Sequence, residues 1–431
     1  MGQADHLGGT GGCLLKILLL HPNFPAQFLN LCLAMGRTSK HEIVFLTERK
    51  EHELEGVRKV YFESPRAPHQ ESHAYLTTVE RAVLQGQAAY KAALQLKKDG
   101  FIPDVILGHS GWGSTLYMKD LFPDSAMIGY FEWFYHAHGT DLDFDPTNPI
   151  RVEEELRTRT INVPFLLDLT TCDAGISPTH WQRNQFPAEH RHKIWVCHDG
   201  VQTERYVPAP GTKIVIAEQG LDLSQAVEVV TYVGRGMESY RGFPQFMKAM
   251  ALVLQQRPGC HVVIVGAERI AYGGSPPSNY ASYKEWAKKE IDLDWSRVHF
   301  TGLLPRNLYL QVLQASSVHV YLTYPFVLSW SMLEAMSAGC LLVASDTPPV
   351  REVISDGDNG VLTDFFDVTA IAKKVMQALE QGKELDPIRN AARRTIVDRY
   401  DWRKLLPQQV NFLVHMAQQA RRISATRKCN K

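Results

Sequence analysis

The sequence predicts an α/β protein with two Rossmann-like domains. In both halves of the 431-residue chain, short apolar runs alternate with amphipathic stretches long enough for helices, and this alternation is typical of βαβ units around a parallel sheet. Pro208, Pro210 and Gly211 interrupt the chain between the two blocks, where few contacts are expected to cross. We therefore expect one domain over residues 14–200, a linker over 201–212 and a second domain over 213–400.

The first domain is expected to follow a loose, Gly-rich tail at residues 1–13. Its first strand, 14–20, is almost entirely apolar, as strands buried on both faces of a parallel sheet are. Further strands are predicted at 41–47, 104–108, 126–134, 173–177 and 193–197, and helices at 28–35, 72–98 and 181–186. The loops that follow these strands should gather at the carboxyl edge of the sheet, where open α/β sheets bind ligands.

The second domain repeats the alternation. Strands are predicted at 227–233, 262–265, 298–301, 318–322 and 341–344, with helices that end near 256 and 338 and two more at 368–381 and 387–400. A last helix is expected at 401–420 and a basic, solvated tail at 421–431. Residues 267–282 contain two glycines and two prolines, and we expect an inserted surface loop without an assigned role.

Composition excludes several classes of function. The formal net charge is zero, so the chain lacks the basic field with which proteins collect nucleic acid, and no nucleic-acid partner is expected. The seven cysteines are scattered and form no C-x-x-C pair, which predicts neither a disulfide framework nor a zinc site. No apolar run is long enough to span a bilayer. A cytoplasmic location is therefore expected, and attraction of the basic tail to an anionic membrane is the less favoured alternative to a solvated tail.

Two features of the second domain predict an anion site. A loop at 327–330 opens a helix, so that Ser329, Trp330 and Ser331 would present free N–H groups at the helix's positive end. Arg235 and Arg241 flank a Gly-bearing turn directly after a predicted strand. Both guanidinium groups are expected to point at the same anion, because a diphosphate is well matched by paired arginines.

The first domain offers candidates for contact with a sugar. A loop beginning with His109 and containing Trp112 follows one predicted strand, and Glu132 and His136 lie at the end of the next. Imidazole, indole and carboxylate groups at one sheet edge are typical of a sugar site. Asn23 and Phe24, which lie in the loop after the first strand, are expected together with Trp112 to contact an acceptor; for Phe24, packing as a hydrophobic staple of the following helix is weighed equally. The residues leave open which of His109, Glu132 and His136 faces the reacting sugar.

The segment 324–346 resembles the sugar-nucleotide element of retaining glycosyltransferases of family four, through Glu334-Ala-Met-Ser-Ala-Gly339 and the strand that follows. That resemblance implies the GT-B fold, in which two domains face each other across a cleft and the last helix returns to the first domain. It implies that Arg235 and Arg241 hold a diphosphate, that Glu334 contacts the ribose and that Leu303 lies near the nucleobase. The chain departs from the family pattern at Phe326, where an acid would contact the sugar, and in this respect it is similar to a bacterial subgroup.

The resemblance implies transfer of a sugar from a nucleotide diphosphate sugar, with a UDP-sugar as the expected donor, to a hydroxyl group of a glycan or other acceptor. It further implies retention of anomeric configuration and a role in polysaccharide or glycoconjugate synthesis. No cofactor and no metal are expected, because the D-x-D pairs at 141–143 and 292–294 lie among turns and paired arginines with a helix end can neutralise a diphosphate. Two alternatives remain: a non-catalytic sugar-nucleotide binding protein, motivated by Phe326, and an epimerase on the same fold.

Overall fold

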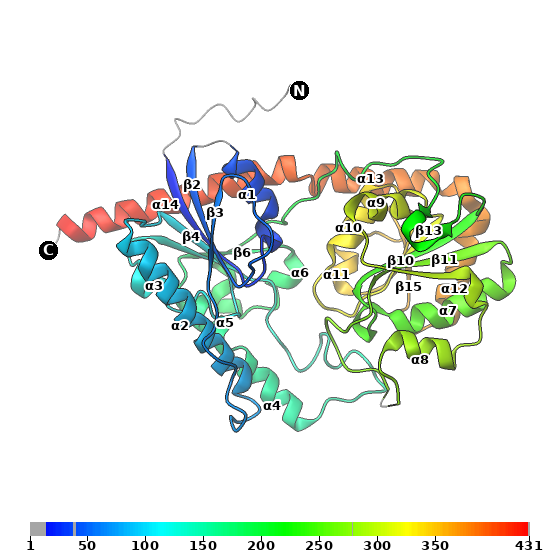
Figure 1. Cartoon of the computed structure of the whole chain (residues 1–431), viewed down its shortest axis with the longest axis horizontal. Helices are drawn as coiled ribbons and strands as arrows, with labels where there is room; N and C mark the ends of the chain where they lie inside the picture. The colour runs from blue at the N-terminus through cyan, green and yellow to red at the C-terminus, as the bar shows by residue number, and fades with distance from the viewer. Residues whose placement is uncertain (1–13, 38–39, 278, 430–431) are drawn as a thin grey trace. The chain divides into compact units, whose positions relative to one another are not determined.

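The fold is known from a computed structural model that describes residues 14–37, 40–277 and 279–429. The chain forms two compact units, Met1–Gly200 with Trp402–Lys431 and Val201–Asp401 (Figure 1). The segment 201–212, expected as a linker, lies within the second unit. There the N–H of Val201 donates to the carbonyl of Tyr400 at 2.7 Å. The tail expected at 1–13 lies outside the described residues.

The first unit contains a seven-stranded sheet in the order β3-β2-β1-β4-β5-β6-β7, and all of its strand pairs are parallel. Its strands are β1 Leu15–Leu20, β2 His41–Thr47, β3 Val57–Tyr61, β4 Val105–His109, β5 Ala126–Tyr130, β6 Ala174–Ser177 and β7 Ile194–Val196. Five of the six side chains of β1 are buried, because helices cover both faces of the sheet. The order reverses direction between β1 and β4, and such a switch point is where open α/β sheets bind ligands.

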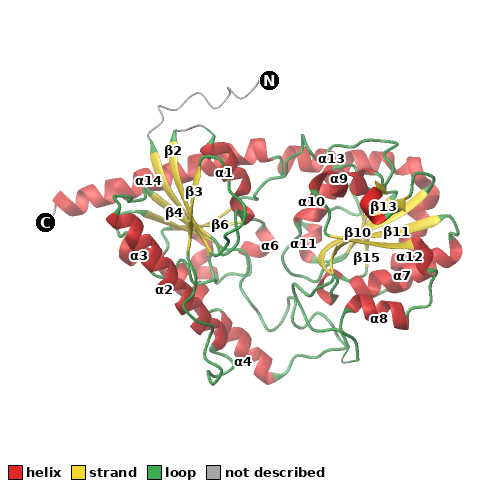
Figure 2. Ribbon diagram, viewed as in Figure 1, coloured by secondary structure: helices red, strands yellow, loops and turns green. Residues whose placement is uncertain are grey.

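Helices lie on both faces of this sheet (Figure 2). Those of the first unit are η1 Ala26–Phe28, α1 Leu29–Gly36, α2 Thr77–Lys98, α3 Met118–Leu121, α4 Val152–Ile161, α5 Val163–Thr171, α6 His180–Arg183, η2 Ala188–Lys193 and α14 Trp402–Cys429. One core joins α1 and α14 to alternate residues of β1 such as Ile17 and Leu19. The other joins α2 and α5 to Leu18 and Leu20.

Three features of the first unit differ from the sequence-based expectation. The strand β3 was not expected, because its sequence, Val-Arg-Lys-Val-Tyr, is partly exposed at the sheet edge. The helices α4 and α5 were not expected either. The strand β5 ends at Tyr130 rather than at residue 134, so Glu132 lies in the loop beyond the strand.

The second unit contains a six-stranded sheet in the order β12-β11-β10-β13-β14-β15 and a two-stranded sheet, β8-β9. The strands are β8 Val215–Ile216, β9 Leu221–Asp222, β10 Glu228–Gly236, β11 Cys260–Ala267, β12 Val298–Gly302, β13 Val318–Tyr321, β14 Leu342–Ser345 and β15 Val361–Thr363. All pairs of the larger sheet are parallel. Its order reverses between β10 and β13, so this unit has a switch point of its own.

Both faces of the six-stranded sheet are covered as well. The helices are η3 Ala217–Gln219, η4 Ser239–Arg241, α7 Phe243–Gln256, α8 Tyr283–Glu290, η5 Trp295–Arg297, α9 Arg306–Gln314, α10 Trp330–Ser337, α11 Pro348–Arg351, α12 Val368–Gln381, η6 Gly382–Leu385 and α13 Asp386–Arg399. Figure 1 shows α9 and α10 on one face and α7 and α8 on the other. On the α7 face, Tyr232 of β10 stacks on Phe246 with ring centroids 4.8 Å apart. The two sheets and their helices are the doubly wound α/β arrangement that the sequence predicts.

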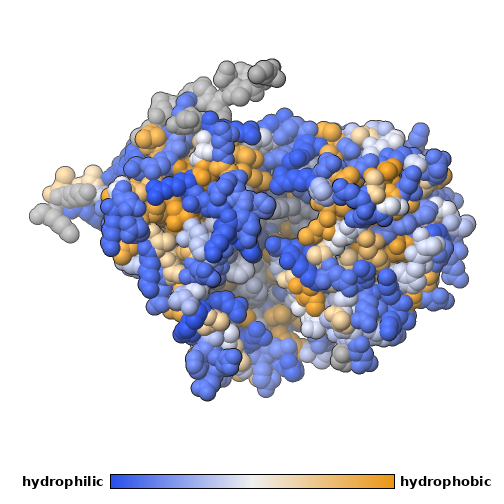
Figure 3. All heavy atoms as spheres, viewed as in Figure 1, coloured by the Kyte–Doolittle hydropathy of each residue, from blue (hydrophilic) through white to orange (hydrophobic). Residues whose placement is uncertain are grey.

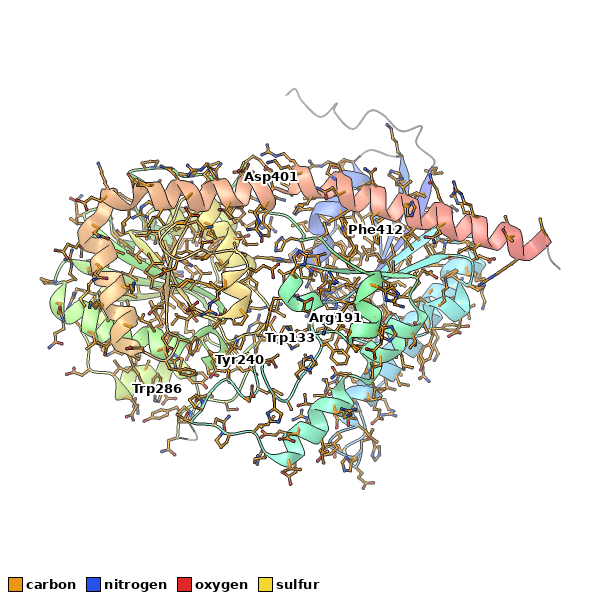
Figure 4. All side chains as sticks on the ribbon, turned by 180° about the vertical axis from the view of Figure 1, so that it is seen from behind. Trp133, Arg191, Tyr240, Trp286, Asp401 and Phe412 are labelled. Carbon is orange, nitrogen blue, oxygen red and sulfur yellow. The ribbon has the colours of Figure 1, made fainter. Side chains whose placement is uncertain are left out.

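The C-terminal helix α14 is longer than expected. It continues to Cys429, so the helix does not end at residue 420 as expected, although most side chains of residues 421–427 are exposed, as a solvated segment requires. Its Phe412 packs on Trp195 of β7 with ring centroids 5.0 Å apart (Figure 4). Arg421 donates to Asp104 Oδ1 at 2.6 Å. The helix thus belongs to the first unit along much of its length.

The described cysteines are all free: Cys32, Cys172, Cys197, Cys260 and Cys340 are buried, and Cys429 is exposed. No helix in the described part of the chain is both long and apolar enough to span a bilayer. On the face shown in Figure 3, hydrophilic and apolar side chains are interspersed.

Candidate functional site

The candidate donor site lies at the switch point of the second unit. Strand β10 pairs with β11 on one side and with β13 on the other. The last residues of β10 with the segment 237–242, and the loop 322–329 after β13, lie at the carboxyl ends of these strands at this point. These loops carry the residues that the sequence predicts for anion binding, so the topology brings the two predicted features together.

Arg241 is the most buried of these cations. Only 7% of it is exposed, and its Nη1 donates to Thr323 Oγ1 at 2.6 Å and to Tyr321 Oη at 3.3 Å. No ion pair with an acidic side chain of the described residues involves it. Glu238 interacts with it electrostatically from beyond ion-pair distance. A buried guanidinium whose partners are neutral hydroxyls favours an incoming anion, because an uncompensated buried charge is costly.

Arg235 is exposed at the end of β10. Its Nη1 donates to the hydroxyl of Tyr272 at 3.3 Å, and the guanidinium carbon of Arg241 lies 5.7 Å from the centroid of the same ring. Both arginines therefore contact one residue of the 267–282 loop. The sequence predicted the two arginines but gave no role to Tyr272.

The N-terminus of α10 differs from the expectation. Ser329 caps the helix: its Oγ accepts from the N–H of Ser331 at 3.3 Å, and its own N–H donates to Tyr321 Oη at 2.9 Å. The N–H groups of Ser329 and Ser331 are therefore not free, which corrects the prediction. Their partners are hydroxyl groups, and a diphosphate oxygen would compete well with these because charge-assisted hydrogen bonds are the stronger kind.

Glu334 is held by two tyrosines. The hydroxyl of Tyr309 donates to Glu334 Oε2 at 2.7 Å, and Tyr206 forms a second side-chain hydrogen bond. Burial raises the pKa of Glu334, and these hydrogen bonds act against the rise. The carboxylate that the resemblance assigns to the ribose thus has partners within its own unit. Leu303, assigned to the nucleobase, is 70% exposed just beyond β12.

Phe326 lies in a group of rings that we call the aromatic cluster: Tyr240, Tyr272, Tyr324 and Phe326. Tyr240 (Figure 4) stacks on Tyr324 with centroids 4.7 Å apart. Phe326 meets Tyr240 at 5.7 Å and Tyr272 at 5.2 Å, both edge to face, a favoured geometry for aromatic pairs. Only 6% of Phe326 is exposed, so its neighbours cover most of the ring.

The 267–282 loop is hydrogen-bonded to Glu238 at the donor site. Glu238 is fully buried, and its Oε2 accepts from the N–H groups of Ala271 and Tyr272 at 2.5 and 2.6 Å. Burial raises the pKa of Glu238, while these two hydrogen bonds and the charges of Arg241 and Arg269 lower it. Residues 271 and 272 of the expected surface loop are therefore tethered to the donor site.

In the first unit, His109 and Glu132 are brought together. His109 is 4% exposed; its Nε2 lies 3.3 Å from Glu132 Oε2 and its Nδ1 lies 3.0 Å from the carbonyl oxygen of Ser110. Gln27 donates to Glu132 Oε1 at 2.9 Å. His136 lies apart from this pair, since its Nε2 is hydrogen-bonded to the carbonyl of Gln185 at 2.7 Å. Of the three candidates that the sequence left open, His109 and Glu132 form one site at the carboxyl edge.

The three acceptor candidates differ in accessibility. Phe24 packs against Phe45 with ring centroids 4.9 Å apart and is 9% exposed. It is therefore a packed core side chain, as the packing alternative expects. Asn23 accepts two hydrogen bonds from Arg49, at 3.1 and 2.8 Å. Trp112 is 44% exposed and its ring lies 6.3 Å from that of His109. Trp112 is thus the exposed aromatic face beside the His109 pair.

Glycosyltransferase family models match both halves of the chain. Residues 39–206 match the family model described as Glycosyl transferase family 4 group, and residues 218–395 match Glycosyl transferases group 1. The chain has the GT-B fold. The structure is similar to that of Anabaena HepE in complex with UDP-glucose, with a TM-score of 0.68 and 16% identity over 93% of this chain and 100% of that one. It is also similar to sucrose-phosphate synthase from Thermosynechococcus elongatus, with a TM-score of 0.66 and 17% identity over 96% of this chain and 100% of that one.

Curated relatives match a smaller part of this GT-B chain. Alpha-maltose-1-phosphate synthase of Mycolicibacterium smegmatis is 25% identical over 242 residues, which are 53% of this chain and 58% of the relative. D-inositol 3-phosphate glycosyltransferase of Corynebacterium diphtheriae is 25% identical over 44% of this chain and 42% of the relative. The alignments thus span about half the length of these relatives.

One acid of each D-x-D pair of this GT-B protein has partners within the protein. Asp143 accepts from the N–H of Gly139 at 2.9 Å, and Asp294 caps η5 and pairs with Arg297 at 2.8 Å. Within residues 14–37, 40–277 and 279–429, no three or more His, Cys, Asp or Glu side chains are grouped so that they would hold an ion.

Sequence reasoning missed Asp168 of α5. It is 1% exposed, and Ser110 and Thr115 donate to its Oδ2 at 2.7 and 2.8 Å. Burial raises its pKa to about 6 against the effect of these hydrogen bonds. It fixes the loop that carries Trp112. A lone acid in the apolar stretch Phe165-Leu-Leu-Asp-Leu169 was the signal in the sequence.

Proposed function

We propose that this GT-B protein transfers a sugar from a nucleotide diphosphate sugar, with a UDP-sugar as the donor, to a hydroxyl group of a glycan or other acceptor. The observation that carries the proposal is the buried guanidinium of Arg241 at the β10–β13 switch point. Its partners are hydroxyl groups, and Arg235 and the N-terminus of α10 lie at the same edge. A diphosphate supplies the anion that these groups favour. The UDP-glucose complex of Anabaena HepE, a protein of the same fold, supports a UDP-sugar as the donor.

The proposed chemistry is transfer with retention. The groups around Arg241 would stabilise the diphosphate as it leaves, because preorganised donors act on charge that develops in the transition state. A phosphate oxygen of the leaving group then accepts the proton of the attacking hydroxyl on the same face of the sugar. No protein nucleophile is needed for this step. His109 and Glu132 are proposed to contact the transferred sugar or the acceptor.

Several finer points belong to the same proposal. We propose that transfer needs no metal ion, because the two arginines and the α10 N-terminus neutralise the diphosphate. A cytoplasmic location is supported by the scattered cysteines, and a role in polysaccharide or glycoconjugate synthesis by the resemblance. Contact of the basic residues of α14 beyond Arg421 with an anionic membrane is the alternative to a solvated surface there.

The test is a donor panel. The purified protein is incubated with UDP-glucose, UDP-N-acetylglucosamine, UDP-glucuronate and GDP-mannose, first without an acceptor and then with simple glycosides. Slow release of UDP or GDP without an acceptor, faster release with one and an α-linked product from an α-linked donor are expected. Conversion of one nucleotide sugar into its epimer would establish the epimerase instead. Tight binding with no turnover under any condition would establish the non-catalytic binding protein.

A further inference from the structure

Tyr272, rather than Phe326, is the residue of the aromatic cluster that contacts both arginines. Phe326 is 6% exposed because Tyr240 and Tyr272 pack edge to face on its ring. Tyr272 is only partly buried. Its hydroxyl accepts from Arg235 and its ring lies near the guanidinium of Arg241. A ligand held by the two arginines would therefore meet the phenol ring of Tyr272 first.

The position of Tyr272 is fixed from beneath by Glu238. This carboxylate is fully buried, and its Oε2 accepts from the N–H groups of Ala271 and Tyr272. Its Oε1 has no hydrogen-bond partner among the described residues. A buried acid with one unpartnered oxygen is destabilising for the fold. Because its Oε2 accepts from two successive N–H groups of the loop, Glu238 holds the backbone of residues 271 and 272 in place.

Close packing holds the loop on either side of this tether. A Cβ atom added to Gly236 would lie 2.3 Å from the carbonyl oxygen of Arg269, so the loop approaches the end of β10 as closely as glycine permits. Gly273 has a φ of +81°, and a Cβ atom there would lie 2.4 Å from the ring of Tyr240. The backbone from 269 to 273 thus fits against both β10 and the aromatic cluster.

We propose that Tyr272, positioned by Glu238, is a specificity-determining residue that contacts the donor sugar. This inference rests on the proposed function and deepens it. The sugar would pack the C–H face of its ring on the phenol and form a hydrogen bond with the Tyr272 hydroxyl, as aromatic and hydroxyl groups of sugar sites do. The aromatic cluster offers rings and phenol hydroxyls and no charged side chain, and the two arginines beside it are assigned to the diphosphate, so the substrate class is a neutral pyranose.

The experiment separates binding of the nucleotide from binding of the sugar. The probes are UDP with UDP-glucose and GDP with GDP-mannose, and the pair whose nucleotide the wild-type protein binds is used for every variant. Calorimetry gives the two affinities, and acceptor-independent hydrolysis gives kcat/KM. The variants are Tyr272→Ala, Tyr272→Phe, Glu238→Ala and the double variant Glu238→Ala/Tyr272→Ala. Tyr280→Phe is the matched control, because this tyrosine of the same loop is hydrogen-bonded instead to Glu290.

Tyr272→Ala is expected to change nucleotide affinity by less than about threefold, because both arginines remain to hold the diphosphate, and to lower kcat/KM for the nucleotide sugar by about tenfold or more, because the contact with the sugar is lost. Tyr272→Phe should give a smaller loss. Glu238→Ala should reproduce the profile of Tyr272→Ala, and the double variant should be no worse than Tyr272→Ala alone, as expected for two residues that act through one contact. Tyr280→Phe should match the wild type.

Three results would overturn the inference. Equal losses of nucleotide and nucleotide-sugar affinity in Tyr272→Ala would show that Tyr272 only supports the arginines. Additive losses in the double variant would show that Glu238 acts elsewhere. If Glu238→Ala does not fold, Gly273→Ala decides, because it displaces the exposed loop against Tyr240 with Glu238 in place; unchanged sugar discrimination in that variant would refute the positioning. A wild-type protein that binds neither nucleotide refutes the proposed function itself, whereas nucleotide binding without a contribution from Tyr272 refutes only this inference.

Discussion

Replacing Arg241 by methionine should weaken nucleotide binding without a loss of stability in the free protein. The guanidinium is 7% exposed and has no ion-pair partner among the described residues. Removing a buried charge relieves a desolvation penalty of several kcal/mol. The change also removes hydrogen bonds to Thr323 and Tyr321, which contribute roughly 1.5 kcal/mol each when one partner is charged, and a cation–π contact with Tyr272 of about 0.5–1 kcal/mol. The net change in unfolding free energy should therefore lie between zero and a gain of about 2 kcal/mol.

The effect on nucleotide binding has the opposite sign. Each charged hydrogen bond from Arg241 to a diphosphate contributes about 1.5–3 kcal/mol, so the Kd of UDP should rise by about 10- to 150-fold. Thermal unfolding with and without UDP reports both effects, because a ligand raises the apparent stability only of a protein that binds it. The variant should melt at the wild-type temperature or above it without UDP, and show a much smaller shift with UDP.

Arg235→Met is the matched control, since this exposed side chain should affect stability by less than about 0.5 kcal/mol while still weakening UDP binding. A single result would refute the reasoning: an Arg241→Met protein that is destabilised by about 2 kcal/mol or more, as expected for loss of a core contact, and that binds UDP as the wild type does. Arg241 would then be a structural residue.

Three further predictions concern metal, donor preference and pH. Excess EDTA should leave donor hydrolysis unchanged, and a loss of activity restored by Mn²⁺ would contradict the metal-free proposal. Phe326→Glu should lower turnover with the native donor, because it places a charge beneath Tyr240 and Tyr272 that costs several kcal/mol; a tenfold increase measured in the hydrolysis assay would mean that the native site is weakened rather than tuned. Burial lowers the pKa of His319 from 6.5 to about 4. Between these two pH values the unfolded chain binds the proton and the folded protein does not, so stability falls as pH decreases from 6.5 to 4. The loss at pH 5 should be about 2 kcal/mol. His319→Gln should flatten this decrease in denaturant titrations at pH 7 and 5, and an unchanged slope would show that His319 is not its cause.

The sequence was informative where one strand or one turn decides the structure. Apolar runs such as 15–20 and 342–345 are buried on both faces, and this pattern needs no knowledge of neighbours. The strand β3 was not predicted because its sequence is partly polar. It lies at the edge of the sheet and pairs only with β2, so its formation depends on that strand. The helix α4 was not predicted because it has no apolar stripe. Only one of its side chains, that of Thr158, is buried.

The same distinction explains the site. Arg235 and Arg241 could be named because a glycine-bearing turn directly after a strand is a local signal. Tyr272 and Glu238 could not be named, because they lie far apart in the sequence and meet only in the folded protein. The residues that Glu238 binds, Ala271 and Tyr272, are more than thirty positions away from it along the chain. The choice between His109, Glu132 and His136 likewise needed the arrangement of neighbouring strands, since β4 and β5 must lie side by side before His109 can meet Glu132.

The rate at which a reagent modifies the buried free cysteines would measure the opening of each unit separately. Cys32, Cys172 and Cys197 lie in the first unit and Cys260 and Cys340 in the second, and burial raises the pKa of the Cys260 and Cys340 thiols to about 12. A thiol reagent attacks the thiolate, so these groups react only when their unit opens and exposes them. Mass spectrometry of alkylated peptides would then give a separate opening rate for each half of the chain. A nucleotide that binds the second unit alone should slow modification of Cys260 and Cys340. The modification rates of the three cysteines in the first unit should not change.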